Sequence, residues 1–166
     1  MKRSCFKILL FLIFLLCPLM GLAKRIDLAP MYKGLDDAIV HIDKYVRIRQ
    51  NRINSLQNQL KMPMGPSARF HIHSKLADEY IPFINDSAIY QLNQCVNLAL
   101  RMGRKDLVEE YRSLISLQCS KTGMYQEAFN VLSGVHTKDL DRKGRCIYYW
   151  AFYNVYNELS YYAQLD

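Results

Sequence analysis

The amino-acid sequence predicts an all-α fold for the chain beyond residue 23. Apolar residues recur there every three or four positions, as on one face of a helix, and proline and glycine fall between the periodic segments. No stretch shows the two-residue alternation of an antiparallel sheet or the strand–helix rhythm of a nucleotide-binding fold. A content of 51% hydrophobic and 22% charged residues suits one globular core rather than a disordered chain.

Residues 1–23 have the order of parts of a secretory signal peptide. Three basic residues precede an unbroken apolar stretch from Ile8 to Leu16, and the segment ends in Gly21-Leu22-Ala23, a small-residue cleavage pattern. We therefore expect cleavage after Ala23 and export to the periplasm. The alternative is an uncleaved anchor in the inner membrane formed by residues 8–23, although these 16 residues are fewer than the ~20 that span a bilayer.

The net charge gives little support to nucleic-acid binding. The formal charge is +7, and three of the 22 basic residues belong to the leader, so about +4 remains after cleavage. The clustered bases are Arg47, Arg49, Arg52 and Lys61, and the solvated face of a helix accounts for them. We expect no nucleic acid among the partners of this segment.

Three cysteines follow the leader: Cys95, Cys119 and Cys146. An exported protein with this odd number has either one disulfide and one thiol or three buried thiols. Each cysteine lies in or beside an apolar helical segment, so we favour three buried thiols.

A long amphipathic helix is predicted over residues 35–62, after a linker over residues 24–34 that contains Pro30 and Gly34. Eight residues at alternating spacings of four and three form one stripe: Leu35, Ile39, Ile42, Val46, Arg49, Ile53, Leu56 and Leu60. Pro63 and Pro66 end this helix because proline lacks an amide donor and restricts the residue before it.

The stripe has two interpretations. It packs within its own domain, or it dimerises as a coiled coil, for which three to four heptads are the minimum. One of its positions, Arg49, is charged, which favours packing within the domain. The coiled-coil alternative describes a membrane-anchored structural module that self-associates through residues 35–60.

Residues 67–166 are predicted to form antiparallel helix pairs. The expected helices cover residues 67–83, 87–102, 106–119, 125–132 and 146–165. The first four make two pairs, and the last begins a third pair that is incomplete.

The segment from Gly123 to Phe129 resembles the turn and second-helix start of a tetratricopeptide repeat (TPR). In that repeat a glycine, here Gly123, permits a tight turn, an aromatic, here Tyr125, packs across it, and a small residue, here Ala128, lets the helices approach. A similar junction lies 40 residues earlier, where Ala88 is the small residue. This spacing is longer than the ~34 residues of a standard repeat. The resemblance implies divergent repeats in which these four residues serve packing.

The wider arrangement is similar to the exported N-terminal half of a family of bacterial membrane-linked regulators. The similarity spans most of residues 35–160: a long helix containing Leu35-Asp36-Asp37 and Arg52 to Leu56, then tetratricopeptide-like pairs. This similarity implies that the chain is the sensor region of a transcriptional regulator and that the output region found in the family is missing from it.

The last 19 residues contain eight of the chain's 20 aromatic residues. A terminal repeat normally has a polar outer face, so this segment looks like a repeat that lacks its cap. Tyrosine hydroxyls would make such a face tolerable to water. Our candidates for partner contact are Tyr149, Tyr153 and Tyr156.

The sequence contains little that indicates catalysis or metal binding. His71 and His73 are two positions apart, so on a helix they point in nearly opposite directions. The adjacent carboxylates Glu109-Glu110 are expected on a solvated face. We predict no enzyme, no cofactor and no metal site. The predicted function is a non-catalytic exported scaffold that binds a protein or peptide. Self-association of the chain is also possible. Contact with a membrane is expected only if the leader is not cleaved.

Overall fold

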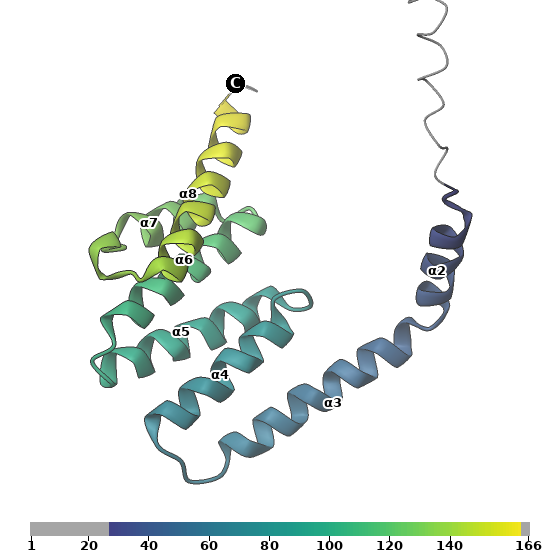
Figure 1. Ribbon diagram of the computed structural model, residues 1–166, viewed down its shortest axis with the longest axis horizontal. Coiled ribbons are helices and arrows are strands. Elements are labelled where there is room, and N and C mark those ends of the chain that lie inside the picture. The colour runs from purple at the N-terminus through teal and green to yellow at the C-terminus, as the bar shows by residue number, and fades with distance from the viewer. Residues whose placement is uncertain (1–26, 164–166) are drawn as a thin grey trace, which may run out of the picture. The chain divides into compact units, whose positions relative to one another are not determined.

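The computed structural model describes residues 27–163, which contain seven α-helices and one short 3₁₀ helix (Figure 1). The predicted all-α class is confirmed. The chain divides into two compact units, Met1–Asp43 and Lys44–Asp166. The predicted signal peptide, residues 1–23, lies outside the described residues.

Helix α2, Ala29–Val40, corrects the predicted linker over residues 24–34. Pro30 lies in the first turn of this helix. The fixed φ of proline suits that position, and its missing N–H is not needed there. Residues 29–34 are therefore helical, because this proline begins a helix instead of interrupting one.

The single helix predicted over residues 35–62 is interrupted at His41. Helix α2 ends at Val40, and helix α3, Ile42–Leu60, begins one residue after His41. The His41 ring Nδ1 lies 2.8 Å from the carbonyl oxygen of Asp37, which also accepts the His41 backbone N–H at 3.1 Å. A side chain that competes for a backbone carbonyl disturbs the helical ladder at that point.

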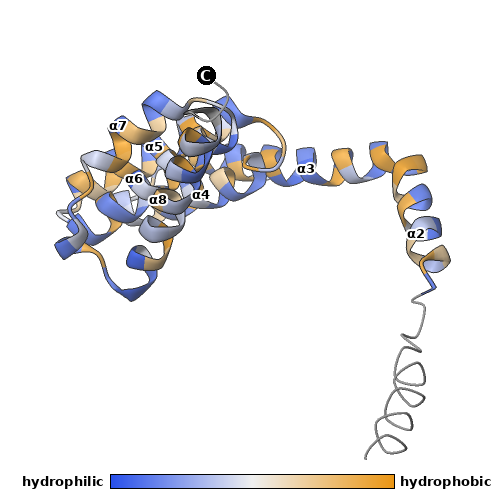
Figure 2. Ribbon diagram, turned by 90° about the horizontal axis from the view of Figure 1, so that it is seen from above, coloured by the Kyte–Doolittle hydropathy of each residue, from blue (hydrophilic) through white to orange (hydrophobic). Residues whose placement is uncertain are grey.

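In the second unit, the C-terminal half of the stripe packs against helix α4, Pro66–Tyr80. Ile53 is fully buried, and the partly buried Leu56 and Leu60 lie beside it. Arg49 donates to the Glu79 carbonyl oxygen at 2.8 Å. Figure 2 shows hydrophobic and hydrophilic residues alternating along α3, as an amphipathic helix requires.

Two helical hairpins follow, and they confirm the predicted pairs. Helix α4 pairs with α5, Asn85–Arg101, and α6, Lys105–Lys121, pairs with α7, Tyr125–Ser133. Short turns join the members of each pair, which makes them antiparallel neighbours. Helix α4 begins at Pro66, one residue before the predicted start, and Gly65 is its N-cap residue.

The 3₁₀ helix η2, Thr137–Asp139, leads into helix α8, Arg142–Ala163, which packs along α6 (Figure 1). Helix α8 begins four residues before the predicted start at Cys146. Asp141 Oδ1 accepts the Gly144 N–H at 2.7 Å, so an aspartate caps the first turn.

Small residues let the helices approach closely. Ala88 and Ala128 are both 0% exposed, and each is the fourth residue of the second helix of a hairpin. The Ser116 hydroxyl of α6 donates to the Ala128 carbonyl oxygen at 2.8 Å, which a bulkier residue at this contact would disturb. Tyr125, partly buried at the start of α7, hydrogen-bonds to Glu158 of α8 over 3.5 Å.

Glycines with positive φ form the turns on either side of α6. Gly103 has φ +67° and Gly123 has φ +81°, the left-handed region that side chains other than glycine rarely adopt. No atom lies within 4 Å of a Cβ added at Gly123, so the backbone conformation alone requires glycine there.

We expect Ala128→Leu to lower the free energy of unfolding by about 1–3 kcal/mol, because the added carbons overpack a fully buried contact. Urea denaturation monitored by circular dichroism measures this. Gln126→Leu is the matched control: the same leucine at an exposed position of α7 should change stability by less than about 0.5 kcal/mol. An unchanged midpoint for Ala128→Leu would contradict the close packing of α6 and α7.

Gly123→Ala should lower the free energy of unfolding by about 1–2 kcal/mol, because alanine is strained in the left-handed conformation. The same denaturation series checks this. The control is Gly134→Ala, since Gly134 has φ −85° and its added Cβ makes only an ordinary contact at 3.5 Å. Equal losses for the two variants would argue against a backbone origin.

Candidate functional site

One side of helix α8 carries four exposed aromatic residues, which we call the aromatic face: Tyr149, Trp150, Tyr153 and Tyr156. Their exposed fractions are 62%, 56%, 60% and 44%. The opposite side of α8 holds Ala151 and Val155, both 0% exposed. The three tyrosines predicted for partner contact therefore lie together on one surface, and Trp150 joins them.

The aromatic rings contact one another along and across α8. Trp150 stacks on Tyr153 with ring centroids 6.0 Å apart. Phe152 stacks on Tyr156 at 4.3 Å, and Tyr156 also meets Phe129 of α7 edge-on at 6.0 Å. These contacts restrict the orientations of the rings.

A buried carboxylate of α6 holds the first turn of α8. Lys143 Nζ donates to Glu110 Oε1 at 2.7 Å, and the Glu110 side chain is only 8% exposed. The hydrogen bond to Glu110 raises the pKa of Lys143 above its usual value. This contact joins the first turn of α8 to α6, and the buried Ala151 and Val155 hold the helix farther along.

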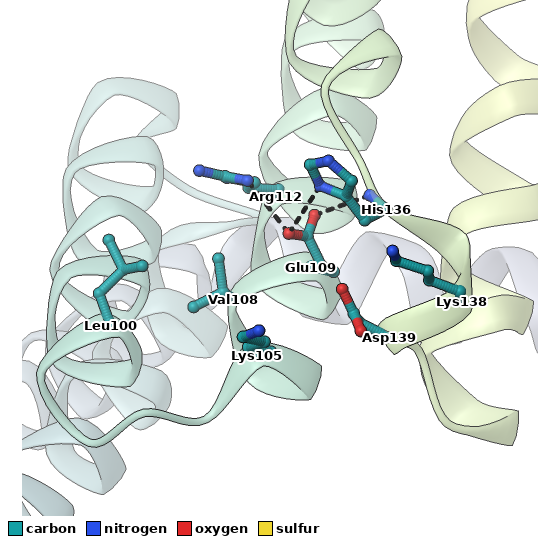
Figure 3. Close-up of a pocket in the computed structure, with 8 residues that line it drawn as sticks. All are labelled: Leu100, Lys105, Val108, Glu109, Arg112, His136, Lys138 and Asp139. Carbon is teal, nitrogen blue, oxygen red and sulfur yellow. Dashed lines mark hydrogen bonds and ion pairs between the residues drawn. The ribbon is translucent and has the colours of Figure 1, made fainter.

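The neighbouring carboxylate, Glu109, anchors the connection between α7 and α8. Its Oε2 accepts the backbone N–H of His136 at 3.1 Å, and its Oε1 lies 3.1 Å from Arg112 Nη1 and 3.4 Å from His136 Nδ1 (Figure 3). A pocket of about 380 Å³ opens beside these groups, with Lys105, Lys138 and Asp139 also on its walls.

The burial of both carboxylates corrects the predicted solvated face. Glu109 is 5% and Glu110 is 6% exposed. Their partners at positions 136 and 143 are far away in sequence, so the local sequence did not indicate that the two carboxylates are buried. Arg112, three residues after Glu109, was the one local sign of an ion pair.

The two histidines of α4 lie as their spacing predicts. His73 is buried, and its Nδ1 lies 2.6 Å from Gln91 Oε1 of α5, while His71 is exposed. Over residues 27–163, no three side chains of histidine, cysteine, aspartate or glutamate are grouped so that they could hold a metal ion.

The expectation of three buried thiols is correct for two cysteines and wrong for the third. Cys95 and Cys119 are buried, and burial raises the pKa of both thiols, that of Cys95 to about 12. Cys146 is exposed, because it lies on the outward side of α8. Tyr148, two residues later, packs against the core, so apolar neighbours in sequence did not reveal which side of α8 Cys146 occupies.

Comparison with known families decides the kind of protein. Residues 39–166 match the family described as the SusR N-terminal TPR domain. The chain belongs to this family. The match confirms the tetratricopeptide resemblance, and it assigns the chain to a type of domain found in SusR regulators. The matched region begins at Ile39, so helix α3 is part of the SusR-type TPR domain.

No curated protein matches the chain, and no solved structure matches it. None of the helices in residues 27–163 combines the length and the hydropathy that crossing a bilayer demands.

Thiol alkylation should separate the cysteines of this SusR-type domain. At pH 8 iodoacetamide should modify Cys146 within minutes and leave Cys95 and Cys119 protected, because only the thiolate reacts and the buried thiols stay protonated. Peptide mass spectrometry of the alkylated protein reports each site. All three should react in guanidinium chloride, and native modification of Cys95 as fast as that of Cys146 would contradict the packing of α5.

Proposed function

We propose that this chain is a non-catalytic, exported helical-repeat domain that binds a protein or peptide as the sensor region of a SusR-type regulator. The observation that carries the proposal is the aromatic face of α8. Four large rings, each 44–62% exposed, lie side by side on one helix. Membership of the SusR N-terminal TPR domain family supports the regulatory context.

The chemistry of the face suits a protein partner. Tyrosine and tryptophan are enriched in the binding hot spots of interfaces, because they bury large apolar areas with few rotatable bonds. A contiguous exposed patch of such residues commonly marks an interaction site on a monomer. The stacking of Trp150 on Tyr153 lowers the entropy that binding would remove.

The repeat framework supports the same proposal. Ala88, Gly123, Tyr125 and Ala128 set the spacing and the turns of the hairpins, and Glu109 and Glu110 fix the helix that follows. We infer that these residues present the aromatic face and do not touch the partner. The leader over residues 1–23 supports a periplasmic location, with an inner-membrane anchor as the alternative.

A second candidate function is self-association through residues 35–60. Within the first unit, Leu35, Ile39 and Ile42 of the stripe are 56–58% exposed, and α2 contains no buried residue. Within the second unit, Val46 is 40% exposed. Exposed apolar residues at heptad spacing favour a coiled-coil partner.

The second candidate makes its own prediction. A peptide of residues 35–61 should gain helical circular dichroism as its concentration rises, because helix formation would be coupled to association. Val46→Asp should abolish the gain by placing a charge in the stripe. A helical signal independent of concentration would exclude this candidate.

Site-specific photo-crosslinking tests the first candidate. With p-benzoylphenylalanine in place of Tyr153 in the full chain, irradiation of producing cells should give a discrete protein adduct, because the probe replaces one ring of the face by another. The same probe at Asn97, an exposed position of α5, is the control. Equal adduct patterns at both positions, or no adduct at Tyr153, would overturn the proposal.

A further inference from the structure

We propose that the pocket beside Glu109 binds a small zwitterion with an apolar side chain, which is either a free amino acid or a short peptide. Lys105 and Lys138 bind the carboxylate of this ligand, and Asp139 binds its ammonium group. The pocket shares no residue with the aromatic face of α8. The inference therefore adds a second binding site to the proposed function.

The pocket has the size and the surroundings of a small-molecule site. Its volume of about 380 Å³ falls within the ~300–1,000 Å³ of such sites. Its walls come from three elements: Leu100 from the end of α5, Lys105 and Val108 from the first turns of α6, and Lys138 and Asp139 from η2. A ligand in this space is contacted from several sides at once.

The pocket is apolar at one end and charged at the other. Figure 3 shows Leu100 and Val108 on one side of Glu109, and Lys138 and Asp139 on the other side. Leu100 is 56% exposed, so much of its apolar surface is available to a ligand. A molecule that fits both ends carries an apolar group and charged groups close together.

Glu109 does not offer its charge to a ligand. Its two carboxylate oxygens already lie 3.1 Å from Arg112 Nη1 and from the backbone nitrogen of His136, and the residue is only 5% exposed. The charges of Glu109 and Arg112 offset each other. Two ammonium groups and one carboxylate remain on the pocket walls, those of Lys105, Lys138 and Asp139.

These three groups are open to a ligand. Over residues 27–163, the side chains of Lys105, Lys138 and Asp139 make no hydrogen bond or ion pair. Both lysines are exposed, and Asp139 is partly buried. Hydrogen bonds between charged groups are about twice as strong as those between neutral groups. A ligand with one carboxylate and one ammonium group therefore pairs with all three.

Other classes of small ligand match fewer of these features. An inorganic anion has no apolar part for Leu100 and Val108, and the Asp139 carboxylate would repel it. A metal ion needs several ligands around one point. In the described part of the chain, the acidic and histidine side chains of this pocket are not grouped in that way.

Isothermal titration calorimetry of the full chain with L-leucine tests the inference. Leucine should bind saturably. N-acetyl-leucine lacks the ammonium group and leucinamide lacks the carboxylate, so each should bind about tenfold more weakly through the loss of a charged hydrogen bond. Glycine keeps both charges and should also bind more weakly, because it lacks the apolar side chain. The dipeptide Leu-Leu separates the two sources: tighter binding than leucine identifies a short peptide, and weaker binding identifies a free amino acid.

Two variants and a control locate the site. Lys105→Gln should weaken leucine binding about tenfold, whereas Lys121→Gln, at the opposite end of α6 and outside the pocket, should leave it unchanged. Asp139→Asn should remove the preference for leucine over N-acetyl-leucine and keep the preference over leucinamide, because it changes only the partner of the ammonium group. Circular dichroism verifies that the variants fold.

The outcomes decide the inference without bearing on the aromatic face. Saturable leucine binding that both acetylation and amidation weaken, and that Lys105→Gln weakens but Lys121→Gln does not, supports it. Equal losses in these two variants overturn the pocket as the site. Equal binding of leucine and N-acetyl-leucine, or displacement of leucine by inorganic phosphate, overturns the zwitterion. Neither heat of binding nor a shift in melting temperature with any of these ligands overturns the whole inference.

Discussion

The burial of helix α6 is the constraint on which the rest of the second unit depends. Helices α5, α7 and α8 and the 3₁₀ helix all pack against it, and ten of its 17 residues are buried. Several of these are polar, and a buried polar group without a partner is destabilising by about 1–3 kcal/mol. The arrangement of the neighbouring helices is therefore tied to satisfying the side chains of α6.

Buried polar residues of α6 are paired with different neighbours. Ser116 donates to α7, Gln118 donates to Asn85 of α5 at 2.9 Å, and Glu110 accepts from Lys143 of α8. Within the described residues no buried side-chain nitrogen or oxygen lacks a hydrogen bond. The same helix thus specifies the positions of three neighbours, where an entirely apolar surface would permit them to slide.

The sequence was sufficient for the features that depend on local spacing. Helical periodicity predicted the hairpins, and Gly123 predicted a turn that requires positive φ.

Features that depend on distant residues were missed: Glu109 and Glu110 gave no local sign of burial, and Cys146 looked apolar in sequence although it faces outward. Pro30 was misassigned because proline favours both loops and first helical turns, and the stripe gave no indication of the break at His41. The clustering of Tyr149, Tyr153 and Tyr156 followed from spacing, but their exposure depends on which helices surround α8.

The order of contacts along the chain has a consequence for how the protein reaches its structure. From α4 onward, each helix packs on its neighbour in sequence, and α8 packs on α6 as well as on α7. Such short-range contacts close small loops and favour rapid folding. A chain that is synthesised from its N-terminus can therefore complete one hairpin before the next has emerged. The Lys143–Glu110 contact joins α8 to α6, so it forms only after α8 has been synthesised.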